Sequence, residues 1–273
     1  MRVETSPMGY EAHYFDSFDS FINETERVAE IEDYEVDDWK ATLRLARMGW
    51  QDELASVEEF SANLVDTIER DTTSTHFETV YGTEGCDVDV NRYLAGEPEN
   101  MISYPLADIS RAGRVITLAV SVTYSGGVSA NTVRLRGHVM TAAAIALDRL
   151  GLNTEIWADR TIKNNLNGHL RRPAISQRIL VKSANDTIDP ARILFATAHP
   201  AMLQSLCFKH CRYGTRWGKD HKQSSGHPQD PERFLPDGAI YMPTINTGRG
   251  DGTDPTGAVE ALRAVLREAG VID

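Results

Sequence analysis

The chain has 273 residues, enough for one large domain or two small ones with a sizeable core. Its hydrophobic fraction of 41% is ordinary for a globular protein, and no apolar run reaches the roughly 18 to 20 residues that cross a bilayer. Its three cysteines, an odd number, argue against a disulfide framework and for a reducing compartment. The amino terminus lacks the apolar segment of a secretory signal, so we expect a cytoplasmic protein.

Charge is divided unevenly along the chain, whose net value is −12. Residues 1–100 hold 25 acids and 7 bases, whereas residues 160–222 hold 12 bases and 3 acids. One interpretation is that the acidic and basic parts fold against each other or form solvated faces. The alternative is a surface that binds nucleic acid through 160–222, although this stretch lacks regularly spaced aromatic residues for stacking on bases.

The first part of the chain is predicted to be mainly helical. A short strand at 12–15 precedes a helix with apolar positions at 18–22. A second helix covers about 39–48 and stops at Gly49, and a third starts near Gln51. The exposed face of the last pair is acidic and would repel phosphate, so we expect these helices to pack rather than to read DNA.

The middle of the chain is rich in loops. After a polar break at 71–75, the pattern predicts a weak strand at 77–81 and a short helical turn at 90–94. Asp87 and Asp89 could pair for acid–base chemistry. They would point to opposite faces of an extended segment, which speaks against that role.

From Arg114 onward the pattern is that of an α/β domain. The segment 115–123 is continuously apolar and β-branched, as is typical of a strand buried on both faces of a parallel sheet. Further strands are predicted at 154–158, 175–183 and 239–243, and helices at 133–150, from Asp189-Pro190, from His199-Pro200 and at 255–269. Arg172 and Arg178, expected to be exposed, favour an edge position for the strand at 175–183.

This order predicts the α/β fold class: an open, mostly parallel sheet sandwiched by helices and preceded by an acidic, mainly helical region. We expect residues 1–110 to form the acidic region, which packs on the core. Residues 111–273 would form the α/β domain.

Three hydroxyl residues, Ser121, Thr123 and Ser125, stand at alternate positions where the first long strand ends. This arrangement resembles the von Willebrand factor A-like fold, in which the strand ends in D-x-S-x-S and helps to bind a divalent ion. The resemblance implies an ion site at the carboxyl end of the sheet, with Asp186 or Asp189 as the nearest further ligands. The leading aspartate is missing here, which removes the charged anchor that a hard cation needs.

The whole chain also resembles an uncharacterised family of bacteriophage and mobile-element proteins. The matching features are residues 45–50 (LARMGW), 89–99 (DVNRYLAGEPE), 136–137 (RG) and 199–203 (HPAML). The resemblance implies a phage-type protein located in the host cytoplasm, with packaging in the virion as the alternative. It supplies no activity.

The loop after the first long strand is the best candidate site, because ligands of open α/β sheets bind where strands end. Its glycines allow a ligand to approach the backbone just before a helix amino terminus, which favours anions. The candidate metal ligands, for Mg²⁺ or another divalent ion, are Ser121, Thr123, Ser125 and Asp186, and the candidate binding residues are Gly126, Gly127 and Arg136. The alternative is a decayed ion site that serves only as a turn.

A zinc site is a second possibility. His199, Cys207, His210 and Cys211 lie close in sequence to His221 and His227, and thiolate and imidazole are preferred zinc ligands. The spacing matches no familiar zinc finger, and Cys207 between Leu206 and Phe208 reads better as a small core residue. We therefore expect no resident cofactor, with Mg²⁺ and then Zn²⁺ as the alternatives.

No motif for covalent catalysis is present. Neither serine nor cysteine sits in a G-x-S-x-G elbow, and the glycine-rich run at 248–252 lacks the Lys-Ser/Thr of a phosphate-binding loop. We expect a protein-interaction or structural protein without its own catalysis. Its partner would be a phage structural protein or, by fold analogy alone, an AAA-type ATPase. The alternatives are a divalent-metal-dependent binder or enzyme that uses 121–127, and nucleic-acid binding through 160–222.

Overall fold

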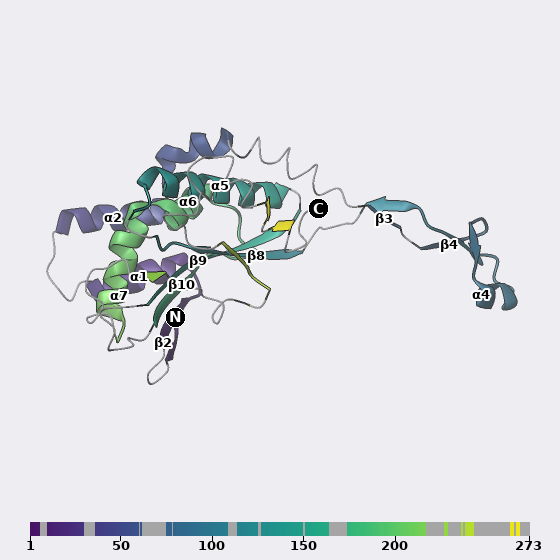
Figure 1. Cartoon of the computed structure of the whole chain (residues 1–273), viewed down its shortest axis with the longest axis horizontal. Coiled ribbons are helices and arrows are strands. Elements are labelled where there is room, and N and C mark those ends of the chain that lie inside the picture. Colours follow the sequence, from purple (N-terminus) through teal and green to yellow (C-terminus); the bar gives the residue numbers. More distant parts are fainter. Residues whose placement is uncertain are drawn as a thin grey trace.

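A computed structural model describes residues 1–5, 10–29, 36–59, 61, 75–77, 79–108, 114–124, 127–149, 151–163, 174–216, 227–228, 236, 238–242, 263–264 and 266–267. These residues form an α/β body and an arm, made of residues 75–77 and 79–108, that projects from the body (Figure 1). Within the described part of the chain, no helix has the length and apolar character needed to span a membrane.

The body is built on one mixed sheet with the strand order β1-β2-β10-β9-β8-β12. These strands are β1 (Arg2–Thr5), β2 (Tyr10–Phe15), β8 (Val115–Ser121), β9 (Asn153–Lys163), β10 (Ala174–Lys182) and β12 (Ile240–Met242), and the short β11 (His227–Pro228) pairs with β9. Of the five pairings along this order in the described chain, three are parallel: β2–β10, β8–β9 and β8–β12. The predicted α/β class with a mostly parallel sheet is confirmed.

The body helices start at or close to the positions that the sequence predicts, although the last one continues to Gly214. They are α1 (Phe18–Ala29), α2 (Val36–Met48), the 3₁₀ turn η1 (Gln51–Glu53), α5 (Ala130–Arg149), α6 (Pro190–Ala198), the π-helix η2 (Met202–Cys207) and α7 (Phe208–Gly214). Asp189 caps α6 by accepting a hydrogen bond from the Arg192 amide, and Pro190 occupies the first turn. Gly49, at φ +77°, follows the end of α2.

The apolar core lies between the helices and one face of the sheet. One cluster joins β8 and β12 to α5 and includes Ile116, Leu118, Val120, Val139, Met140, Leu147 and Met242. A second joins β2, β9 and β10 to α1, α6 and η2 and includes Phe15, Phe18, Phe21, Ala158, Ile179, Phe195 and Leu206. Val120, Ala158, Ile179 and Phe15 are register partners on neighbouring strands, so both clusters lie on the same face. Helical cover on both faces of the sheet stays a prediction.

The predicted edge position of the strand at 175–183 is wrong. β10 pairs with β9 on one side and with β2 on the other, so it is an interior strand. Arg178 is 2% exposed rather than solvated, because Asp159 on β9 supplies a counter-ion at 3.2 Å. Arg172 lies outside the described residues.

Strands from both ends of the chain join the main sheet. β1 and β2 extend it beyond β10, so residues from the expected 1–110 region share a sheet with the expected 111–273 domain. Ion pairs also link early and late segments: Asp19 with Arg192 at 2.8 Å and Glu53 with Arg134 at 3.2 Å. The division near residue 110 stays a prediction.

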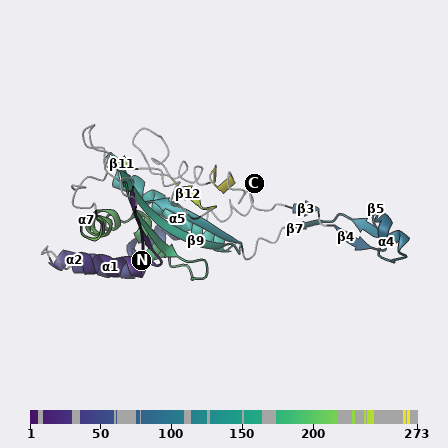
Figure 2. The same ribbon diagram turned by 90° about the horizontal axis from the view of Figure 1, so that it is seen from below.

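The arm contains two small antiparallel sheets. β3 (Thr75–Phe77) pairs with β7 (Leu106–Asp108) near the body, and β4 (Val80–Gly82), β6 (Met101–Ser103) and β5 (Asp87–Val88) form a three-stranded sheet further out. The helix α4 (Val90–Leu94), predicted as a helical turn, lies at the far end (Figures 1 and 2). The helix expected at 255–269 is described only at 263–264 and 266–267, where Leu266 joins the β8 cluster.

Candidate functional site

The hydroxyl residues at the end of β8 are buried. Ser121 is 2% exposed and Thr123 is fully buried, and the Thr123 amide donates a hydrogen bond to Ser121 Oγ at 3.3 Å. Gly127 is exposed in the turn that precedes α5, whereas Ser125 and Gly126 lie outside the described residues. In the described part of this predicted site, Ser121 ends β8, Thr123 is buried just after the strand, and Gly127 lies in an exposed turn.

The structure does not bring Asp186 to the predicted ion site. Asp186 follows β10, and its Oδ2 accepts a hydrogen bond from the Ser183 amide. Because β10 runs antiparallel to β9 while β8 runs parallel to it, β10 runs toward the end of the sheet at which β8 starts. Lys182, the last residue of β10, is level with Ile156 of β9. Ser121 is level with Asp159, which lies three positions further along β9, and Asp186 follows Lys182 in the opposite direction.

Arg136, a predicted binding residue, has a structural contact. Its side chain is 9% exposed, and its Nη2 donates a hydrogen bond to the Met242 carbonyl at 2.9 Å. This bond ties α5 to the edge strand β12.

A buried ion pair that the sequence reasoning missed lies beside Ser121. Its partners are Asp159, which is level with Ser121 in the β8–β9 register, and Arg178. Asp159 accepts a hydrogen bond from Thr161 Oγ1 at 3.0 Å, and Arg178 Nε donates one to Ser176 Oγ at 3.0 Å. Burial lowers the pKa of Arg178, and the charge of Asp159 opposes that shift. A carboxylate neutralised by a guanidinium is a poor ligand for a hard cation. The available signal was an acid, Asp159, directly after one predicted strand and a base, Arg178, inside the next.

The four predicted zinc ligands do not form one cluster. His199 Nδ1 accepts a hydrogen bond from the Ala201 amide, and burial lowers its pKa. Cys207 is a core residue whose thiol pKa burial raises to about 12, and Cys211 packs against other buried residues of the sheet. Among the described residues, which include all four candidates, no group of three or more His, Cys, Asp or Glu is placed to hold a metal ion.

His210 belongs instead to a buried polar network. The His210 Nδ1 atom lies 2.8 Å from Gln177 Nε2, and Gln177 Oε1 accepts a hydrogen bond from Arg160 at 2.9 Å. The His210 ring contacts the ring of His13, whose Nε2 lies 2.7 Å from the Glu11 carboxylate. Burial lowers the pKa of His210 to about 3, with smaller contributions from the charges of His13 and Arg160. The network links β2, β9, β10 and α7 within the core.

The basic stretch 160–222 does not present all its charges to solvent. Arg160, Arg178 and Lys182 are buried, Arg192 pairs with Asp19, and the remaining described bases include exposed Arg212 and Arg216. Charges used inside the body cannot contact phosphates. Nucleic-acid binding through 160–222 stays a prediction, with Arg212 and Arg216 as its exposed bases among the described residues.

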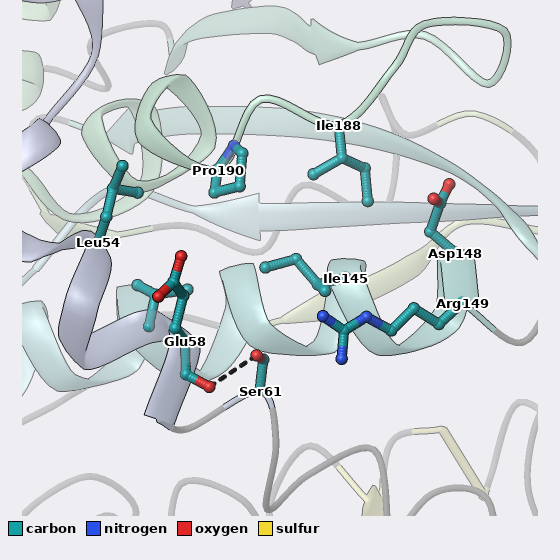
Figure 3. A pocket seen from close by; sticks show the side chains of 9 residues that line it. Leu54, Glu58, Ser61, Ile145, Asp148, Arg149, Ile188 and Pro190 are labelled. Atoms are coloured by element: carbon teal, nitrogen blue, oxygen red, sulfur yellow. Dashed lines mark hydrogen bonds between the residues drawn. The ribbon is translucent and has the colours of Figure 1, made fainter.

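The body carries an open pocket of about 280 Å³ beside the end of α5 (Figure 3). Its lining comprises Leu54, Val57, Glu58, Ser61, Ile145, Asp148, Arg149, Ile188 and Pro190. Ser61 Oγ donates to the Glu58 carbonyl at 2.8 Å, and the described lining carries two carboxylates, of Glu58 and Asp148, but no histidine or cysteine. The volume is slightly below that of typical small-molecule sites, which occupy roughly 300 to 1,000 Å³.

The tip of the arm, residues 80–103, is the largest group of exposed apolar side chains in the described structure. Val90, Tyr93 and Leu94 of α4 are 62%, 63% and 76% exposed, and Tyr81 and Val88 lie nearby in sequence and are also exposed. None of the described residues 79–105 is buried. The tip therefore owes its order to something other than a hydrophobic core.

Hydrogen bonds and one stacked cation hold the tip together. Asp89 caps α4 by accepting from the amides of Asn91 and Arg92, and its own amide donates to the Asn100 carbonyl at 2.8 Å. The Arg92 guanidinium lies 3.9 Å from the centre of the Tyr81 ring. Gly85 is required by a close approach, because a Cβ there would lie 2.4 Å from the Ile102 carbonyl oxygen.

Comparison with known proteins gives a family and no activity. No curated protein and no solved structure matches the chain. One family model, described as a domain of unknown function (DUF7192), matches residues 5–273. The match spans the body and the arm together, and the chain belongs to the DUF7192 family.

Proposed function

We propose that this protein is a non-catalytic interaction protein and that its arm docks on a protein partner. The observation that carries the proposal is an ordered arm that projects from the body and exposes Val90, Tyr93 and Leu94 at its far end (Figure 1). Large exposed apolar groups that lie together mark interaction sites more often than scattered ones do.

The energetics of the tip fit a docking role. Fully burying one large apolar side chain contributes roughly 1.5 to 3 kcal/mol, so three neighbouring residues can supply most of a moderate affinity. Tyrosine is also enriched among the residues that dominate binding energy. The capped helix and its hydrogen bonds order the tip before binding, which lowers the entropy lost on association.

The metal-dependent alternative has less support. Arg178 neutralises Asp159, the carboxylate beside Ser121, and Asp186 lies toward the other end of the strands. The resemblance to bacteriophage proteins supports a structural or adaptor role, in the host cytoplasm or the virion. A partner of the AAA-type ATPase class is supported by fold analogy alone.

Site-specific photocrosslinking tests the docking role. A photoreactive phenylalanine analogue replaces Tyr93 at the tip or Val115, an exposed body residue, in the full chain produced in cells that carry its gene. We expect a crosslink to a partner protein from position 93 and no crosslink to that protein from position 115. Leu94→Asp should abolish the crosslink from position 93, because a charge replaces an apolar anchor, whereas Val115→Asp should leave it unchanged.

Absence of a crosslink from position 93 would contradict the proposal. Equal crosslinking from positions 93 and 115 would contradict it as well, since the tip would then have no special affinity. Circular dichroism of the Leu94→Asp chain provides the folding control, because Leu94 is exposed and its change should leave the body intact.

A further inference from the structure

We propose that the tip of the arm binds an apolar groove with a basic rim on a partner protein. This inference rests on the docking role proposed above and adds the chemistry of the partner surface. It follows from the spacing of the apolar residues on α4 and from the charges around them.

The apolar residues of α4 share one face of the helix. Val90, Tyr93 and Leu94 stand at positions i, i+3 and i+4, which bring side chains together on an α-helix. This is the spacing with which an amphipathic helix enters a hydrophobic groove. All three are more than half exposed, so the face has no cover within the described structure.

The segment that carries this face is rich in acidic residues. Residues 79–108 contain six acids and one base, and five of the acids are Glu84, Asp87, Asp89, Glu97 and Glu99. The one base, Arg92, is held over the Tyr81 ring and lies 3.6 Å from Glu97, so it offsets only one of the six negative charges. The tip therefore carries an excess of negative charge beside its apolar face.

A negative surface selects its partner by charge. Complementary potential favours a groove lined by Lys or Arg and raises the rate of encounter. The same charge repels the phosphates of nucleic acid and the anionic lipids of a cytoplasmic membrane face. A protein groove with a basic rim is the partner that satisfies both the apolar and the charged parts of the tip.

The test extends the crosslinking from position 93 by mapping the partner peptide with mass spectrometry. We expect apolar residues flanked by more Lys and Arg than Asp and Glu. Crosslinking should fall by about tenfold between about 0.05 M and about 0.5 M NaCl, because salt screens exposed charges. Glu84→Lys with Glu99→Lys should lower it comparably, since the described structure assigns neither carboxylate a partner.

A matched variant separates local charge from net charge. Asp52→Lys with Glu58→Lys makes the same change on the body and should leave the crosslink unaltered. A tip-specific crosslink to a neutral or acidic surface, to nucleic acid or to a second copy of the chain would overturn the basic-rim inference, as would insensitivity to the Glu84 and Glu99 changes. Loss of any tip-specific protein crosslink would instead overturn the docking role itself.

Discussion

Several charged side chains of this protein lie in its core, where ordinary residue statistics would not place them. Arg178, Asp159 and Arg160 are each at most 2% exposed, and each has a polar partner on a neighbouring strand. Asp159 and Arg178 are distant in sequence and meet only through the antiparallel register of β9 and β10. Their burial is tolerated because the pair and the adjacent hydroxyls compensate the charges.

His210 should make stability depend on pH below neutrality. Its ordinary pKa of 6.5 is lowered by burial to about 3 in the folded protein. Below pH 6.5 this histidine is therefore protonated in the unfolded chain but stays neutral in the folded chain. The free energy of unfolding should fall as the pH decreases toward 3, by at most roughly 1.4 kcal/mol per pH unit. Above pH 6.5 this residue contributes no slope. Urea unfolding at a series of pH values measures the effect.

His210→Asn is the matched variant for this prediction. An asparagine oxygen can accept the hydrogen bond from Gln177 but cannot titrate. The free energy of unfolding of the variant should vary less between pH 6.5 and 3 than that of the unmodified chain. If the free energy of unfolding of the variant varied with pH as steeply as before, a group other than His210 would be responsible for the pH dependence.

At the scale of the elements, two glycines in the sequence motifs at 45–50 and 136–137 mark close contacts between helices and neighbouring segments. A Cβ on Gly137 of α5 would lie 2.2 Å from the Ala198 Cβ of α6. Gly49, at φ +77°, lies against the backbone of Ala191, and the next residue, Trp50, donates its amide to the Ala191 carbonyl. Both glycines let helical segments approach α6 closely.

Gly137→Ala should destabilise the body although alanine favours helices. The added methyl group forces α5 and α6 apart, and overpacking of this kind costs about 1 to 3 kcal/mol, against a helix-propensity gain of up to about 1 kcal/mol. The double variant Gly137→Ala with Ala198→Gly moves the methyl group to the other helix. The free energy of unfolding of this double variant should be higher than the value obtained by adding the effects of the two single changes.

Denaturant unfolding of the four chains in this cycle measures the coupling. A coupling energy of zero would mean that α5 and α6 do not meet at these positions in solution. Gly82→Ala serves as a control, because the nearest atom to its added Cβ would be at 3.5 Å, an ordinary contact.

The whole molecule combines a cooperative body with an arm of different construction. The body gathers strands and helices from residues 2 to 242 around shared apolar clusters, and ion pairs such as Asp19 with Arg192 join distant segments. The arm is held by its own hydrogen bonds, and its described residues 79–105 bury no side chain. Its stability should therefore be largely independent of the body.

Removal of the arm tests this independence. Replacing residues 79–105 with a short Gly-Ser turn between β3 and β7 should change the melting temperature of the body by no more than a few degrees, because no described core residue is lost. Differential scanning calorimetry measures the transition. A large drop in the melting temperature would show that the arm supports the body through contacts that its exposure does not suggest.

Local sequence patterns were enough to predict many of the helices and strands. Apolar periodicity, caps and glycine stops indicated β2, β8 and β9, and they also indicated α5 and the short α4 of the arm. These features depend on neighbouring residues, whose propensities and spacing are written directly in the chain. The α/β class followed from their order.

The contacts between segments came from the three-dimensional fold. It placed β10 between β9 and β2, buried Arg178 against Asp159, separated Asp186 from Ser121, and put His210 in a core network instead of a zinc site. It also extended residues 80–103 away from the body, so that a turn predicted from local signals became an exposed apolar surface. Strand register and long-range burial set these outcomes, and they depend on pairings between distant segments that local pattern does not encode.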